Sequence, residues 1–135
     1  MPSFRLLASA LFALALIALP QGASAQSISD AQRGDIEKAE KALRRAIKID
    51  EKYVQALATL GSALFMQGKL DAAENFSQKA LAIEPQFGPA INNLALVAME
   101  RGDFAKAKEF VESARATGFE PHPGMVQEIE TGLAK

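Results

Sequence analysis

The stretch from Val54 to Gln86, VQALATLGSALFMQGKLDAAENFSQKALAIEPQ, contains two segments with helical apolar spacing, placed back to back. Leu57, Leu60 and Leu64 recur three and four residues apart, which puts them on one face of a helix. A second set with the same spacing follows: Ala73, Ser77 and Ala80. Because neither helix can bury its apolar face alone, the stretch predicts a helical hairpin.

Small and apolar residues of this hairpin recur along the chain at an interval of 34 residues. The positions that share the interval are Gly34, Gly68 and Gly102; Ala39, Ala73 and Ala107; Ala46, Ala80 and Ala114; and Ile36, Leu70 and Phe104. A period of this length, with small residues in constant places, is typical of stacked helix-turn-helix units. The sequence therefore predicts a single all-α domain built from helical hairpins.

The hairpin resembles the tetratricopeptide repeat family, whose pattern is W-x2-L-G-x2-Y, then A-x3-F, then P. The matching residues are Leu60, Gly61, Ala73 and Pro85, with Leu57 and Leu64 at the Trp and Tyr places. Ser77 departs from the aromatic residue of the pattern, so we expect a thinner contact between the two helices there. The resemblance covers roughly residues 34–121 and implies a right-handed helical-hairpin solenoid of about two and a half repeats.

The expected element boundaries follow from this register. We expect the second helix of a partial repeat at residues 34–52, a full repeat at 54–87, a looser repeat at 88–121 and a capping helix at 123–135. The helix of the partial repeat is expected to begin at Ile36. Gly68 is expected to end the first helix of the full repeat, because glycine tolerates a positive φ. Asp71 with Glu74 predicts a capping box at the start of the second.

Residues 1–25 have the order of a secretory signal peptide. Arg5 precedes an apolar run from Leu6 to Leu19, and Ala23-Ser24-Ala25 forms a small-x-small cleavage site. The run is shorter than the roughly 20 apolar residues that a membrane-spanning helix needs. We therefore expect a cleaved, exported chain of residues 26–135, located in the periplasm or secreted, with an uncleaved anchor as the alternative.

Composition argues against several classes of function. The chain holds 15 basic and 16 acidic residues, and this near-neutral balance disfavours nucleic-acid binding. It has no cysteine, so disulfides, thiolate nucleophiles and haem attachment are excluded. The single histidine, His122, lies between two prolines and is expected to pack against or cap the last helix. With no phosphate loop or acyl-transfer motif, we expect no enzyme activity, cofactor or metal.

The resemblance also implies a binding surface. In this family the first helix of each hairpin lines a concave groove that holds a peptide or helix of a partner protein. Carried over by register, the groove residues are Gln55, Ala58, Ser62, Phe65, Met66, Asn92, Asn93, Leu96 and Met99. Only Asn93 fits the charged pattern with which the family clamps a carboxylate. For Phe65, Met66 and Leu96, burial between helices is the alternative.

The function predicted from these features is a non-catalytic protein-interaction adaptor of the bacterial cell envelope. An uncharged groove suits an amphipathic helix or an extended apolar segment. Two other functions stay open. One is a self-assembling scaffold, in which a second subunit covers an apolar flank of the partial repeat formed by Ile36, Leu43 and Ile47. The other is peripheral contact with an anionic partner or membrane surface through Lys41, Arg44, Arg45 and Lys48, whose alternative is a solvated outer face.

Overall fold

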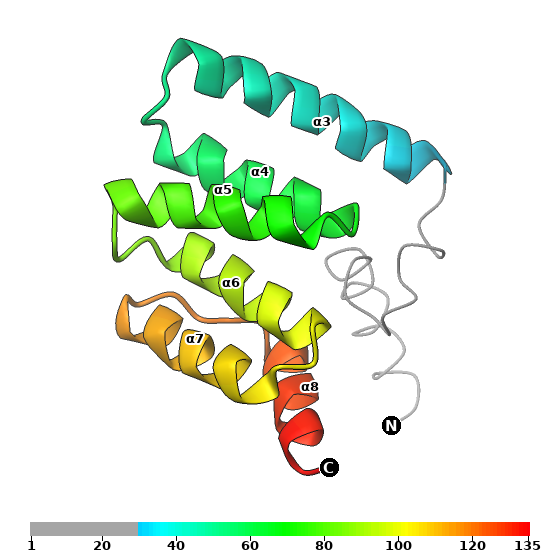
Figure 1. The fold of residues 1–135 in the computed structure, drawn as a ribbon, viewed down its shortest axis with the longest axis vertical. Coiled ribbons are helices and arrows are strands. Elements are labelled where there is room, and N and C mark those ends of the chain that lie inside the picture. Colours follow the sequence, from blue (N-terminus) through cyan, green and yellow to red (C-terminus); the bar gives the residue numbers. More distant parts are fainter. Residues whose placement is uncertain (1–29) are drawn as a thin grey trace, which may run out of the picture.

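The computed structural model describes residues 30–135, and every regular element in this range is an α-helix. The helices are α3 (Asp30–Ile49), α4 (Val54–Met66), α5 (Leu70–Ile83), α6 (Gly88–Glu100), α7 (Phe104–Ala116) and α8 (Pro123–Leu133). They stack in chain order, with α3 at one end and α8 at the other (Figure 1). The prediction of an all-α stack of hairpins is confirmed over these residues, whereas the predicted signal peptide lies outside them.

Two complete hairpins form the body of the stack. The most extensive packing is between α4 and α5 and, equally, between α6 and α7. The turns within these hairpins contain Gly68 and Gly102, whose φ angles are 74° and 79°. Residues that carry a side chain rarely adopt this left-handed backbone region. Glycine therefore ends the first helix of each hairpin, as expected for Gly68. None of the helices in the described range is long and apolar enough to cross a membrane.

The first helix is longer than the sequence predicted. It begins at Asp30 rather than Ile36 and continues through Gly34. Glycine inside a helix costs only about 1 kcal/mol relative to alanine, and no proline interrupts this stretch. Within the described chain, α3 packs mainly against α4, and none of the α3 residues whose exposure is described is fully buried.

The predicted capping box of α5 is wrong. Lys69 occupies the N-cap position and no side chain caps the helix. Asp71 lies inside the helix, so its carboxylate is not placed to accept from the free backbone amides. Asp71 and Glu74 instead accept hydrogen bonds from Arg101, which lies just after α6, each at 2.5 Å. These carboxylates therefore connect the start of α5 to the turn of the next hairpin.

The core of the first hairpin centres on a close approach between α4 and α5. Leu60 and Leu64 are fully buried, and Ser77 is also fully buried at the place of the family's aromatic residue. A Cβ atom added to Gly61 would lie 2.6 Å from Ser77 Oγ. The small residues thus let the two helices close up, and the Ser77 hydroxyl donates to the carbonyl of Ala73 at 2.8 Å. The thin contact expected at Ser77 is replaced by direct helix-to-helix packing.

Candidate functional site

In each of the two hairpins, the first helix has one row of side chains that stays accessible to solvent. The accessible residues of α4 follow helical spacing, and so do those of α6. We call these two rows the α4–α6 surface; they are Gln55, Thr59, Ser62 and Met66 on α4, and Pro89, Asn92, Leu96 and Glu100 on α6. Three pairs of these positions are separated by one repeat, which places the two rows on the same side of the stack. The helices α4 and α6 also contact each other directly.

The structure divides the nine predicted groove residues into two groups. Gln55, Ser62, Met66, Asn92 and Leu96 lie on the α4–α6 surface. The other four are at most 6% exposed: Ala58, Phe65, Asn93 and Met99. The prediction that these four line a groove is wrong, because their side chains turn into the helix packing. Phe65 joins a core cluster with Val97 of α6, and Met99 joins one with Ile129 of α8.

Asn93 is a cross-link between the two first helices. Its Nδ2 donates to the carbonyl oxygen of Ala58 at 2.8 Å, and its Oδ1 accepts from Ser62 Oγ at 2.9 Å. Both ends of the amide are thus used inside the protein, and the side chain is 3% exposed. Asn93 therefore stabilises the arrangement of α4 and α6 and is not placed to bind a partner.

The neighbouring Asn92 has the opposite character. Its side chain is half-buried on the α4–α6 surface, yet its Oδ1 atom is enclosed and has no hydrogen-bond partner in the described part of the chain. An unsatisfied buried acceptor costs about 1–3 kcal/mol. The atom is closed off from solvent in the described structure, so a partner's donor would reach it only if the side chain rotated.

One end of the α4–α6 surface is acidic. Glu100 closes the row on α6, and its negative charge acts on Glu128 of α8. Burial, followed by the charge of Glu100, raises the pKa of Glu128 above its ordinary value. A cationic group of a partner would relieve this like-charge repulsion. The sequence analysis did not identify this feature, since the two residues are brought together only by the placement of α8.

The four cations that the sequence predicted on α3 are all exposed, but among them only Arg44 takes part in a described ion pair. Arg44 bonds to Glu40 at 2.9–3.0 Å and lies over the Phe76 ring, 5.4 Å from its centroid. The same Glu40 accepts from Gln67 at 2.7 Å, and this hydrogen bond is the main cause of its lowered pKa. Arg44 is therefore part of a network that joins α3 to the first hairpin. The exposed cations of α3 that no described ion pair involves include Lys38, Lys41, Arg45 and Lys48.

The apolar flank predicted for self-assembly is partly buried. Leu43 and Ile47 are half-buried against the core cluster of the first hairpin, and Ile36 is half-buried as well. Leu43 and Ile47 thus pack partly against the first hairpin, although Ile47 also lines an open cleft with Phe76 and Ile83 of α5. Self-assembly through this flank stays a prediction. Among the exposed apolar residues at this end of the stack is Ile49, which is 88% exposed.

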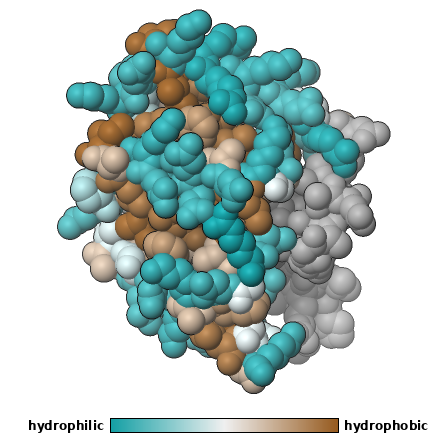
Figure 2. Space-filling view, in the orientation of Figure 1, coloured by the Kyte–Doolittle hydropathy of each residue, from teal (hydrophilic) through white to brown (hydrophobic). Residues whose placement is uncertain are grey.

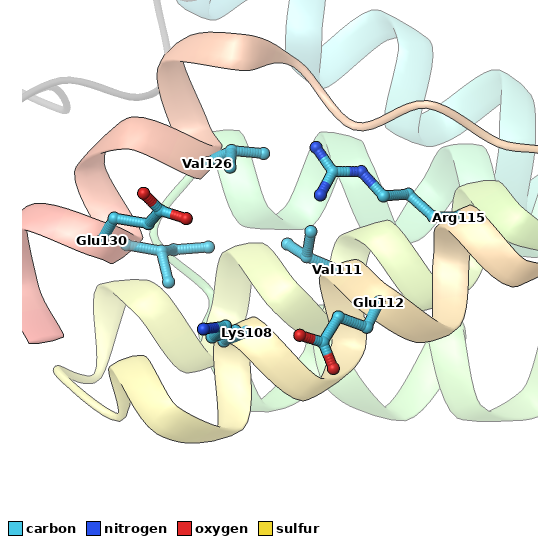
Figure 3. Close-up of a pocket in the computed structure, with 7 residues that line it drawn as sticks. Lys108, Val111, Glu112, Arg115, Val126 and Glu130 are labelled. Carbon is cyan, nitrogen blue, oxygen red and sulfur yellow. The ribbon is translucent and has the colours of Figure 1, made fainter.

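Two cavities lie away from the α4–α6 surface. One lies between α7 and α8 (Figure 3); it holds about 30 Å³, room for one water, and is lined by Lys108, Val111, Glu112, Arg115, Val126, Ile129 and Glu130. The other is an open cleft of about 450 Å³ between α3 and α5, lined by Ile47, Glu51, Leu57, Phe76, Lys79, Ala82 and Ile83. Neither lining contains a nucleophile with a neighbouring base of the kind that catalysis needs.

His122 caps the last helix, as predicted. Its Nδ1 accepts a hydrogen bond from the backbone N–H of Gly124 at 3.0 Å, which satisfies a free donor at the start of α8. Burial lowers the pKa of His122 and so favours the neutral ring that this acceptor role requires. Among the described residues, no group of three or more His, Cys, Asp or Glu side chains is arranged to hold a metal ion.

Comparison with known families identifies the repeats. A Tetratricopeptide repeat model matches residues 64–123, and a TPR repeat model matches residues 29–68. Residues 29–123 of this chain therefore belong to the tetratricopeptide repeat family. Repeats of this family generally mediate protein binding and are typically non-catalytic, and no catalytic family matches the chain. No curated protein matches the sequence.

Proposed function

We propose that this chain is a non-catalytic adaptor that binds a helix or extended segment of a partner protein on the α4–α6 surface. The observation that carries the proposal is that the same repeat positions stay accessible on two successive first helices. Met66 is 36% exposed, and Leu96 is half-buried one row away. These apolar side chains would pack against apolar residues of the partner, and methionine adapts to partners of different shape.

The polar groups of the surface restrict the partner further. Asn92 carries an enclosed acceptor that lacks a donor and would need to turn outward to bind one, and Glu100 with Glu128 favours a basic residue at one end. The expected partner segment therefore carries apolar residues in its middle and a Lys or Arg near one end. Since Asn93 ties α4 to α6, the surface is formed before binding and little ordering cost is incurred.

We also propose that the adaptor works in the bacterial cell envelope, with the periplasm as its location. Support comes from the sequence of residues 1–25, whose positive charge, apolar run and small-x-small site follow the order of an export signal. The partner is accordingly expected among envelope proteins.

The test is an affinity capture from the cell-envelope fraction. The bait is the protein purified from cells, with its N-terminus as the cell has processed it. The variant Met66→Glu places a charge on the α4–α6 surface, and Ile83→Glu is the matched control because Ile83 is similarly exposed, at 41%, on α5. We expect Met66→Glu to lose the partner and Ile83→Glu to retain it. Circular dichroism should show that both variants are folded. Equal retention by both variants would show that the partner binds elsewhere.

A further inference from the structure

We propose that the outer face of α3 docks on a bilayer surface that contains anionic lipids. This inference is independent of the adaptor function, since it concerns a different face of the molecule. It rests on four cations, on their position at the end of the stack, and on the apolar residues beside them.

The cations are Lys38, Lys41, Arg45 and Lys48, which we call the outer row. Their spacing of three, four and three residues puts them on one face of the helix, along about 15 Å. All four are exposed, and the ion pairs of the described chain involve none of them. Arg44, which is also exposed, differs from these four because it is paired with Glu40. The outer row therefore carries four positive charges that no described ion pair neutralises.

The position of the row suits a flat surface. Leu43 marks the side of α3 that packs on the hairpin core, and Arg45, two residues later, points to roughly the opposite side. The helix α3 is the last helix at its end of the stack, with no described helix beyond it (Figure 1). A plane can therefore lie along the outer row without meeting the rest of the described fold.

Exposed apolar residues accompany the cations at the C-terminal end of α3. Ile49 is 88% exposed and Tyr53 is 47% exposed. Figure 2 shows hydrophilic residues along the α3 edge of the molecule and a hydrophobic patch where that helix ends. An aliphatic side chain and a tyrosine next to lysines are typical of helices that lie in a membrane interface, where lysine stems lie along apolar surface and their charges reach the headgroups.

Other features of α3 favour a lipid surface over an acidic protein. The outer row lies on the exposed face of a helix at the end of the described stack, where a flat surface can reach all four cations. Three of its four cations are lysines, whose ammonium groups act as point charges. Arginine is favoured where a protein binds a carboxylate through two hydrogen bonds, so the row resembles such a site less. Asp35 and Glu37 lie near the start of the row, so the positive potential is strongest from Lys41 to Lys48. Because the whole chain has a net charge of −1, attraction to anionic lipid depends on this local row.

The experiment is co-sedimentation of the cell-processed protein with phosphatidylcholine vesicles, with and without phosphatidylglycerol, at low and high salt. We expect binding that depends on phosphatidylglycerol and weakens as salt screens the charges. Lys41→Glu with Arg45→Glu should lower the partition coefficient at least about tenfold, since each cation near such a surface contributes a several-fold change. Lys108→Glu with Lys135→Glu makes the same change in net charge on α7 and after α8, and should retain binding.

Several outcomes would overturn the inference. Equal binding to both kinds of vesicle, or equal loss in the two double variants, would show that the outer row does not direct docking. A protein that ignores the vesicles but binds polyglutamate through Lys41 and Arg45 would identify an acidic protein partner instead. Circular dichroism of each variant separates these results from unfolding.

Discussion

The adjacent residues Asn92 and Asn93 should respond in opposite ways to truncation. Asn93→Ala removes the hydrogen bonds to the carbonyl of Ala58 and to the Ser62 hydroxyl. Two such bonds are worth about 1 kcal/mol each, and the lost amide leaves a small cavity at a site that is 3% exposed. We expect a loss of about 2–3 kcal/mol in the free energy of unfolding, or roughly 8–20 °C in Tm for a domain of this size.

Asn92→Ala should change stability by less than about 1 kcal/mol. It removes an enclosed acceptor that has no hydrogen-bond partner in the described chain. Removing this acceptor also removes the free-energy cost of burying it unsatisfied, and this gain offsets the packing that is lost. Its effect should appear in binding instead, because a partner's donor loses its acceptor. Thus the two neighbouring asparagines lie on different sides of α6: Asn93 stabilises the helix packing, and Asn92 is the one that the proposal assigns to partner binding.

The assay is urea unfolding followed by far-ultraviolet circular dichroism, with both variants measured beside the unchanged chain. Ser62→Ala serves as a control, since it removes only one of the two bonds and should cost about 1 kcal/mol. The double variant Ser62→Ala with Asn93→Ala should cost less than the sum, because the two side chains share a bond. Equal losses in Asn92→Ala and Asn93→Ala would refute the assignment of the two roles.

Three further predictions concern other parts of the chain. Gly61→Ala should cost about 1–3 kcal/mol in urea unfolding, since the new Cβ would lie 2.6 Å from Ser77 Oγ, and adding Ser77→Ala should recover part of the loss. The stabilisation from neutral His122 is fully present above its ordinary pKa of about 6.5 and declines as pH falls below that value. His122→Asn keeps a capping acceptor, so its stability should lack this decline when unfolding is compared at about pH 7.5 and about pH 5. If residues 1–25 are a cleaved export signal, as proposed, N-terminal sequencing of the protein recovered from cells should begin at Gln26, whereas a start at Met1 would indicate a retained segment.

The hairpin architecture was predictable because its signal is repeated. A 34-residue interval fixes which segments pair, and Gly68 with Gly102 marks the turns where a positive φ is needed. The extent of α3 was less predictable, since the residues from Asp30 to Ile36 carry no apolar period yet contain nothing that breaks a helix. Similarly, the partners of Asp71 and Glu74 lie about one repeat away at Arg101, and local capping patterns cannot indicate such a contact.

The α4–α6 surface was predicted only in part, because successive residues of a helix differ in direction by about 100°. Phe65 and Met66 are both apolar and adjacent, but Phe65 is 6% exposed whereas Met66 is 36% exposed. Which of them faces a neighbouring helix depends on the crossing of α4 with α6, and that crossing is set by Asn93 and the small residues around Gly61. The sequence did contain a signal for this cross-link, namely the polar residue Asn93 within a mainly apolar helix. Such a residue often forms hydrogen bonds to a neighbouring helix.

The two proposed surfaces should work independently. The α4–α6 surface runs across the hairpins, whereas the outer row of α3 faces away from them at the end of the stack (Figure 1). A membrane along α3 would therefore leave the α4–α6 surface accessible to a partner. It follows that Met66→Glu should leave vesicle binding unchanged, and that Lys41→Glu with Arg45→Glu should leave partner capture in solution unchanged. If either variant abolished both activities, partner and membrane would share one surface, and one of the two assignments would have to be withdrawn.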